Sequence, residues 1–363
     1  MLIFTKNYIM RNYLYLSLLL CVVFSCKKEV VEDSVLPEDY GKGMYIVTDL
    51  GVSYLDYKES NAVIQHEIFN AVNGSSIVNP KKIEIDGNKA YIVGNKLYVV
   101  NINTFGLLGE VSGFYNSVDC NIVTDNRAFV VDRGESLVQV VDLSKFEIIS
   151  QLETGDSTKP VSIISNSSTS FVLNGGRIPA SKKDTTLVVI KHRDGLVPLA
   201  AISNVLNIGE NPNSAVLGSQ LDVLCKGIYN PDDLSNNTES SIQVVNQYSY
   251  EMYDSYVLSG VYNAQNLVKN WNGSKYYFTA VGGVYRLNST TYVPVQILNV
   301  NADVINTSVE QVAINDTTNV SMQMLYMNDL DNPNKVYKYN VDSGIFEDTI
   351  NVNGNVLDIQ FYN

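Results

Sequence analysis

The stretch that decides the fold is KKIEIDGNKAYIVGNKLYVVNINTFGLLGEV, residues 81–111. It contains four short apolar runs, rich in β-branched and aromatic residues, and such runs favour strands. The segments between the runs are rich in Gly, Asn and Asp, which are the usual residues of tight turns. The stretch therefore predicts a unit of four antiparallel strands joined by short turns.

This four-run pattern recurs along the chain with a period of roughly 40–50 residues, the range typical of propeller blades. The second copy, CNIVTDNRAFVVDRGESLVQVVDLSKFEIISQLETG, spans residues 120–155. Further copies begin at Val161, Ser214, Asn266 and Glu310. The repeats predict six complete units.

The two ends of the repeat region complement one another. Residues 43–68 contain runs for a second, third and fourth strand but lack a first, and residues 355–363, NVLDIQFYN, match an isolated first strand. Joining them completes a seventh unit and leaves no open sheet edge. The prediction is an all-β, seven-bladed β-propeller in which N- and C-terminal strands close one blade; an open β-solenoid is the alternative.

The N-terminal segment has the features of an export signal. Residues 10–26 read MRNYLYLSLLLCVVFSC, in which Arg11 precedes an apolar stretch too short to span a bilayer. Its end, residues 23–26, resembles a lipobox, with the small residue Ser25 directly before Cys26. We expect a lipoprotein signal peptide at 1–25, acylation of Cys26 and anchoring to a lipid bilayer. The alternative is an ordinary secretory signal that contains a cysteine.

Residues 26–40 are expected to form the lipidated cysteine and an acidic tether, and residues 41–363 the propeller. The tether, KKEVVEDSVLPEDY, has no apolar periodicity. It resembles the surface-export signals of lipoproteins in Gram-negative gut anaerobes. This resemblance implies attachment to the outer membrane and exposure on the cell surface.

Two motif pairs, AYIVGN…LYVVNINT and AFVVDRG…VQVVDLSKF, resemble the YVTN…VSVIDxxT pattern of YncE-like propellers. The resemblance covers about residues 43–363 and implies the propeller fold. Lipid-anchored relatives include the cobalamin-binding BtuG surface lipoproteins, which sit over an outer-membrane transporter. The resemblance thus implies a TonB-dependent transporter as partner, although no corrinoid-specific motif can be carried over residue by residue.

Composition excludes some classes of function. The 363 residues carry a formal net charge of −13, and basic residues occur at most in pairs. Nucleic acid is therefore not an expected partner, since binding to phosphates needs basic clusters. Cys120 and Cys225 lie far apart in strand-like runs, and no CxxC occurs. They are expected to be buried thiols rather than a disulfide or a zinc framework.

Candidate ligand contacts lie on the loops that join second to third strands and fourth to first strands, because binding residues gather on loops around a rigid scaffold. Two second-to-third loops are long, 174–185 and 226–240, and a third, 328–335, is of intermediate length. Aromatic rings, amides and a few cations on these loops suit a flat or polyhydroxylated small molecule. The expected ligand-binding residues are Asn79, Lys81, Tyr115, Asn116, Arg133, Lys159, Arg177, Tyr229, Tyr262 and Asn263.

No catalytic residue, metal ligand or cofactor site is expected. Asp329 and Asp331 superficially suggest calcium, but their loop has no Gly at the bend and no distal Glu. No carboxylate pair suggests a glycosidase, and His66 and His192 lie in strand-like or turn segments. The expected function is capture of a corrinoid- or glycan-like nutrient for a transporter. The alternatives are an envelope interaction scaffold or a lyase or hydrolase propeller.

Overall fold

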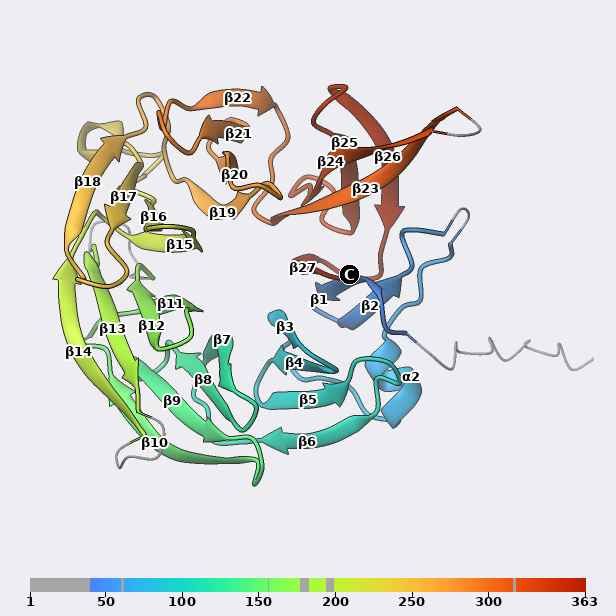
Figure 1. Cartoon of the computed structure of the whole chain (residues 1–363), viewed down its shortest axis with the longest axis horizontal. Coiled ribbons are helices and arrows are strands. Elements are labelled where there is room, and N and C mark those ends of the chain that lie inside the picture. The colour runs from blue at the N-terminus through green and yellow to red at the C-terminus, as the bar shows by residue number, and fades with distance from the viewer. Residues whose placement is uncertain (1–39, 60–61, 156, 177–182, 194–198, 316–317) are drawn as a thin grey trace, which may run out of the picture. The chain divides into compact units, whose positions relative to one another are not determined.

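Each sequence repeat folds into one antiparallel sheet, and seven sheets surround a central axis (Figure 1). The computed structural model describes residues 40–59, 62–155, 157–176, 183–193, 199–315 and 318–363, with the backbone alone for 312–315 and 318–319. The compact unit runs from Asp39 to Asn363. The prediction of a seven-bladed β-propeller is confirmed; Cys26, the signal segment and the tether before Tyr40 lie outside the described residues.

The blades follow one another along the chain. Blade 1 contains β1 (Gly43–Thr48), β2 (Gly51–Leu55) and β27 (Val356–Tyr362). Blades 2, 3 and 4 contain β3 (Lys82–Asp86), β4 (Lys89–Val93), β5 (Leu97–Asn101), β6 (Leu107–Val111), β7 (Ser117–Thr124), β8 (Arg127–Asp132), β9 (Leu137–Asp142), β10 (Glu147–Glu153), β11 (Pro160–Ser165), β12 (Thr169–Asn174), β13 (Thr186–His192) and β14 (Ala200–Asn207).

Blades 5 to 7 complete the ring. They contain β15 (Pro212–Leu217), β16 (Leu221–Cys225), β17 (Ser241–Val245), β18 (Met252–Val257), β19 (Gln265–Lys269), β20 (Lys275–Ala280), β21 (Gly283–Asn288), β22 (Val295–Leu298), β23 (Ile305–Asn315), β24 (Thr318–Asn328), β25 (Lys335–Asn340) and β26 (Ile345–Asn351). In each complete blade the first strand lies nearest the axis and the fourth lies outermost (Figure 1).

The C-terminal strand closes the ring. Strand β27 pairs antiparallel with β1, so that Tyr362 lies opposite Gly43 and Asp358 opposite Val47. The prediction of a fourth strand in blade 1 is wrong. The described residues there form only an isolated bridge between Tyr54 and Gln65. Helix α2 (Ile68–Asn73) follows the bridge and packs against β2.

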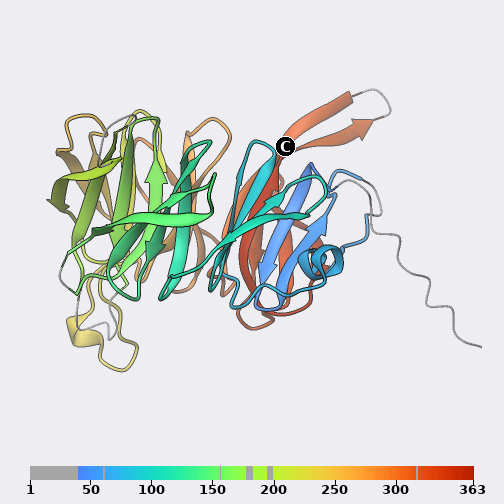
Figure 2. The ribbon, with the colours of Figure 1, turned by 90° about the horizontal axis from the view of Figure 1, so that it is seen from below.

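Blade 7 also differs from the prediction. The sequence pattern placed its first strand at Glu310, whereas β23 begins at Ile305 and is eleven residues long. Only Met324–Asn328 of β24 pair with β25, so the outer parts of β23 and β24 have no third strand beside them. These parts form a two-stranded ribbon that extends beyond the blade (Figure 2). The alternating run after Glu310 was misread as an inner strand because it has the same period.

The second and third strands of the blades are apolar because neighbouring blades cover both of their faces. All six residues of β12 and all five residues of β16 are buried, whereas β18 and β10 are mostly exposed. A sheet covered on both sides needs continuous rather than alternating apolar residues. The position of a strand within its blade therefore determines its pattern of apolar and polar residues.

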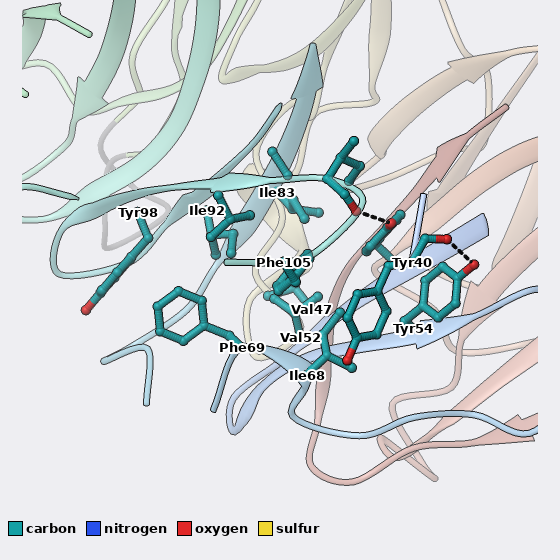
Figure 3. Packing of buried hydrophobic residues seen from close by; sticks show 14 of the residues in the cluster. Tyr40, Val47, Val52, Tyr54, Ile68, Phe69, Ile83, Ile92, Tyr98 and Phe105 are labelled. Atoms are coloured by element: carbon teal, nitrogen blue, oxygen red, sulfur yellow. Dashed lines mark hydrogen bonds between the residues drawn. The ribbon is translucent and has the colours of Figure 1, made fainter. Parts of the chain in front are cut away.

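Hydrophobic clusters occupy each of the seven interfaces between adjacent blades, as far as the chain is described. Figure 3 shows the cluster between blades 1 and 2, in which Ile68 and Phe69 of α2 pack near Val47 and Phe105. The Phe69 ring meets Tyr98 edge-on at 5.5 Å. Helix α2 thus covers the side of blade 1 that has no fourth strand.

The turns between the third and fourth strands of blades 2, 3, 5 and 6 share one geometry. In blade 2, the Asn101 side chain accepts hydrogen bonds from the backbone N–H groups of Asn103 and Thr104, at 2.9 and 3.2 Å. Phe105 then adopts a left-handed backbone with φ of 55° and is fully buried. Phe146, Tyr250 and Tyr292 have the same conformation. The strain, of order 1–3 kcal/mol per residue, is offset where the ring is buried between blades.

The propeller has two distinct faces. We call the face with the second-to-third and fourth-to-first loops the loop face, and the opposite one the turn face. On the loop face the two kinds of loop are bonded together, as in Arg133 N to Asn116 O at 3.0 Å and Lys226 N to Asn211 O at 3.0 Å. The loop between Lys226 and Ser240 and the blade 7 ribbon extend from opposite faces (Figure 2).

Cys120 and Cys225 are buried free thiols, which confirms the sequence interpretation. Burial raises the pKa of Cys225 to about 12, so the thiol is unreactive at neutral pH. In the part of the chain that the structure describes, no helix has the length and apolar character needed to cross a bilayer.

Deletion of residues 355–363 is expected to open the ring. The deletion exposes the β1 edge and removes the buried side chains of Val356 and Ile359. Each such side chain contributes about 1.5–3 kcal/mol, and each kcal/mol is worth roughly 2–4 °C in a chain of this size class. We expect the thermal midpoint, measured by circular dichroism, to fall by roughly 6–24 °C.

A circular permutant provides the matched control. Placing residues 355–363 before Gly43 through a short linker preserves the β27–β1 hairpin, since Tyr362 already lies opposite Gly43. This permutant should keep the original midpoint. An unchanged midpoint in the deletion variant would contradict closure by β27.

Candidate functional site

The first strands of all seven blades surround one central cavity of about 440 Å³. Its wall is largely polar. The lining side chains that carry the argument below are Lys81, Lys82, Glu84, Asp119, Asn213 and Asp358.

β-Bulges direct several of the lining residues into the cavity. Strand β7 is irregular between Ser117 and Asp119, and β11 and β15 are irregular at the equivalent places. The extra residues, Val118, Val161 and Asn213, line the cavity. A bulge inserts one unpaired residue and changes the direction of its side chain, so the repeated bulge makes the wall of the cavity.

Side chains on the first strands also connect neighbouring blades. The Asp358 carboxylate accepts a hydrogen bond from Ile83 N at 3.0 Å, and the Asp119 carboxylate accepts one from Ile163 N at 3.0 Å. Lys82 forms a salt bridge of 2.6 Å with Asp119. These contacts join blades 1 to 2, 2 to 3 and 3 to 4 at the axis.

The resulting charge cluster is unbalanced, with three carboxyl groups around one ammonium group. Burial, opposed by Lys82, raises the pKa of Glu84 to about 7 and that of Asp358 to about 6. Burial lowers the pKa of Lys82, but the charges of Asp119, Asp358 and Glu84 outweigh this effect and hold it above its usual range. The cavity interior thus stays charged and takes up protons near neutral pH.

Positive charges gather on the loop face, at or next to residues that line the cavity. We call Lys81, Arg133, Lys159 and Lys226 the cationic mouth. The Lys81 ammonium donates to Asn116 Oδ1, and the Lys226 ammonium donates to Gln265 Oε1 at 3.0 Å. The Lys159 ammonium donates to the carbonyl oxygens of Arg133 and Gly134, both at 3.3 Å.

Arg133 lies across the loops of blade 4. Its guanidinium donates to the carbonyl oxygen of Gly176. A Cβ added at Gly176 would lie 2.8 Å from Arg133 Nε and 2.7 Å from Val161 Cγ1, so a larger residue there would displace the Arg133 or Val161 side chain. Burial and, after it, the charge of Arg133 lower the pKa of both Lys81 and Lys226. Arg133 is therefore the centre of the cationic mouth.

The structure brings some of the sequence-predicted residues together. Lys81, Asn116, Arg133 and Lys159 meet at the mouth. Tyr229 and Tyr262 form an aromatic pair with centroids 6.3 Å apart beside it. The chain positions this pair next to Lys226, whose carbonyl oxygen accepts from the backbone N–H of Asn263 at 3.2 Å.

Other predicted residues do not join this group. Tyr115 is 70% exposed and lines a separate hollow with Glu135 and Gln151. Asn79 is exposed and has a left-handed backbone with φ of 53°, which fits a turn residue before Pro80. Arg177 lies outside the described residues.

Sequence reasoning missed Lys226 and the cavity charges. Lys226 was noted only as the start of a long loop, because the residues that surround it come from blades 3 and 6. Asp119 and Asp358 occupy equivalent positions, one residue before the end of their partner strands β8 and β1. A carboxylate repeated at that position in SVDCNI and VLDIQF was the available signal.

Asp329 and the two histidines make local contacts. The Asp329 carboxylate accepts bonds from Asp331 N at 3.0 Å, Asn332 Nδ2 at 2.8 Å and Tyr337 OH at 3.1 Å, so it organises its own loop. Within the residues placed by the structure, no three His, Cys, Asp or Glu side chains are grouped to hold a metal ion. His192 lies 2.8 Å from Ser170 in blade 4, and His66 lies 3.4 Å from Ser53 in blade 1.

Known structures share this architecture. A quinonprotein alcohol dehydrogenase-like protein from Bacteroides thetaiotaomicron matches with a TM-score of 0.60 and 11% identity, over 90% of this chain and 80% of that one. The Cps50 (Swd1) β-propeller domain of Myceliophteria thermophila matches with a TM-score of 0.54 and 10% identity, over 76% and 87% of the two chains. The computationally designed Ika8 protein has the same score and identity, over 90% and 92%.

At these identities the likeness shows the fold alone. The sequence matches no protein-family model, and no curated protein matches it. The sheet topology and this likeness together define a seven-bladed β-propeller.

The charge cluster predicts a stability that falls as pH rises from about 5 to 8. Glu84, with a pKa of about 7, and Asp358, with a pKa of about 6, bind protons in the folded state that the unfolded chain has already released. The stabilisation is present at low pH and is lost as pH passes through the folded-state values, by roughly 1–3 kcal/mol. Lys82 is protonated in both the folded and the unfolded state over this range, so it does not contribute to the pH dependence of stability.

Denaturant unfolding at several pH values measures how the free energy of unfolding changes with pH. The Glu84→Gln variant should show a weaker dependence between pH 5 and 8, because one of the two titrating groups is gone. Glu153→Gln, on the exposed strand β10, is the matched control and should retain the slope. Equal slopes in all three proteins would refute the assignment.

Proposed function

We propose that the chain is an envelope-anchored binding protein that captures a small polar nutrient at the cationic mouth and performs no catalysis itself. The observation that carries this proposal is the convergence of loops from several blades, which places cations and amides around the opening of one cavity. Concave sites with a few convergent polar groups are the usual form of small-molecule sites.

The position of Tyr40 is compatible with an anchor that leaves the cationic mouth accessible. Tyr40 and Gly41 bond to Asn103 and Ile102, which belong to the turn between β5 and β6 on the turn face. A chain anchored ahead of Tyr40, through Cys26, is attached on that face. The cationic mouth opens on the opposite face and remains accessible to a ligand.

The kind of nutrient follows from the side chains and from the sequence resemblance. The Tyr229–Tyr262 pair gives an aromatic surface beside amide and ammonium groups, which suits a flat corrinoid or a polyhydroxylated glycan. The sequence resemblance to YncE-like lipoproteins, whose relatives include the cobalamin-binding BtuG proteins, is the reason to test the first of these. It also supports a TonB-dependent outer-membrane transporter as the partner that receives the ligand at the cell surface.

A second candidate function, a protein-interaction scaffold of the envelope, rests on the turn face. The ribbon of β23 and β24 extends beyond blade 7 with unpaired outer edges (Figure 2). Trp271 is 75% exposed near the base of the ribbon, and its backbone N–H donates to Gln323 Oε1 at 3.3 Å. Exposed strand edges and aromatic side chains are frequent in protein interfaces.

Substitution of Cys26 is expected to abolish lipidation. Cells that express Cys26→Ser should incorporate no labelled palmitate into the protein, because the acyl-accepting thiol is lost. Cys21→Ser, in the same segment, is the matched control and should be labelled normally. Labelling of the Cys26 variant would rule out this anchor.

Obstruction of the mouth is expected to abolish ligand binding without unfolding the ring. Asn116 is exposed at the mouth, and Asn103 is exposed on the turn face. Isothermal calorimetry against cobalamins and a panel of oligosaccharides should show at least tenfold weaker binding for Asn116→Trp, about 1.4 kcal/mol. Asn103→Trp should bind as the unaltered protein does.

The thermal midpoints of both variants should be unchanged, because both positions are exposed. The proposal fails if no compound in the panel binds, or if the Asn116→Trp variant retains full affinity.

A further inference from the structure

None of the four cations at the mouth has a salt-bridge partner in the described ranges, and Lys159 differs from the other three in that its ammonium donates to two carbonyl oxygens. Lys81, Arg133 and Lys226 make no salt bridge with any carboxylate in the described ranges, although Lys82, the next residue along the chain, pairs with Asp119 at 2.6 Å. Each of the three is partly buried. A cation removed from water is normally paired, so these groups lack the compensation that the rest of the fold provides.

Their hydrogen-bonding capacity is also incompletely used. An ammonium group has three donors, and a guanidinium group has five. Within the described residues, Lys81 and Lys226 each donate to a single side-chain amide oxygen, and Arg133 donates to a single carbonyl oxygen through its side chain. Several donors on each group are therefore open to a ligand.

Packing contacts place the three groups around one opening. Asn116 links the first two, because its side chain accepts from the Lys81 ammonium and its carbonyl oxygen accepts from Arg133 N at 3.0 Å. Arg133 packs against Gly176. The adjacent Gly175 touches the Asn211–Pro212 peptide, and the Asn211 carbonyl oxygen accepts from Lys226 N at 3.0 Å.

The nearest carboxylates are already engaged elsewhere. The Asp132 carboxylate accepts from the backbone N–H groups of Tyr115 and Asn116 at 2.9 and 2.7 Å. The Asp303 carboxylate accepts from Asn328 Nδ2 at 2.6 Å. Neither lies within salt-bridge distance of the three cations, as far as the structure describes the site. Their attraction is long-range and leaves the donors unoccupied.

We propose that Arg133, Lys81 and Lys226 form a subsite for an anionic oxygen group, a phosphate or a carboxylate, of the captured ligand. Arginine binds such groups through paired N–H donors, and two lysines supply further charge-assisted bonds. This inference rests on the proposed function and specifies the chemical class of its ligand.

The cavity below determines how the ligand is oriented. Glu84, Asp119 and Asp358 line its wall and repel a second anion. The anionic group therefore stays at the mouth, and the part of the ligand that enters the cavity of about 440 Å³ is neutral or cationic. Opposite charges at two depths select a ligand with one anionic end.

A series of sugars that differ in one group tests the proposal. Glucose, glucuronate and glucose 6-phosphate share a ring and differ in charge, and inorganic phosphate tests the phosphate group alone. Calorimetry on the full chain purified in detergent should show one of two results. Either glucuronate binds at least tenfold more tightly than glucose, or phosphate and glucose 6-phosphate do. The first result assigns the source of the anion to a carboxylate and the second to a phosphate; both support the subsite.

Charge-neutralising variants provide the matched comparison. Arg133→Gln combined with Lys226→Gln should weaken binding of the anionic probe at least tenfold. Lys89→Gln combined with Arg286→Gln removes the same net charge elsewhere and should change it less than twofold. The proposal is overturned if glucose binds as tightly as the anionic sugars, if none of the three anionic probes binds, or if the first double variant keeps its affinity.

Salt dependence of the unaltered protein provides a readout that does not require a folded variant. Affinity for the anionic probe should fall at least tenfold between 0.05 and 0.5 M NaCl, because screening weakens charge pairing. A salt-independent affinity also overturns the subsite. If a neutral compound binds and Asn116→Trp abolishes that binding, the proposed capture function stands while the anion subsite fails.

Discussion

The pairing of β27 with β1 is the contact on which the rest of the propeller depends. It joins residues more than 300 positions apart in the sequence and gives blade 1 its innermost strand. The same strand carries Asp358, whose carboxylate binds Ile83 N in blade 2 at 3.0 Å. One terminal strand thus closes the ring, connects two blades at the axis and supplies part of the cavity wall. A closed ring has no terminal blade with an exposed face, which removes an edge open to aggregation.

The same turn between the third and fourth strands recurs in several blades, which explains why blades of different sequence have a similar backbone geometry there. An Asn or Asp at the end of the third strand accepts backbone N–H bonds, as Asn101 and Asp142 do. Four residues later, an aromatic side chain such as Phe105 or Phe146 takes a left-handed backbone. Phe105 packs fully into the interface between blades. The NINTF and DLSKF motifs are therefore structural, and carry no information about a ligand.

Charge, by contrast, is distributed unevenly over the ring. Carboxylates gather inside the cavity around Lys82, whereas Lys81, one residue earlier, lies with Arg133 and Lys226 at the opening. For the proposed ligand, two layers of opposite sign provide an attractive entrance and a definite orientation. In a chain with a net charge of −13, such a local cationic site also contrasts with the surrounding surface.

The sequence by itself determined the number of blades, the closure by residues 355–363 and the burial of the two thiols. These follow from period, strand pattern and turn residues, all of which are local. It did not determine the missing fourth strand of blade 1, the ribbon of blade 7 or the convergence of Lys226 with Arg133 and Lys81. Those features arise from bulges, loop packing and the arrangement of seven blades about one axis. They bring together residues that are distant in the chain, and no local pattern records such proximity.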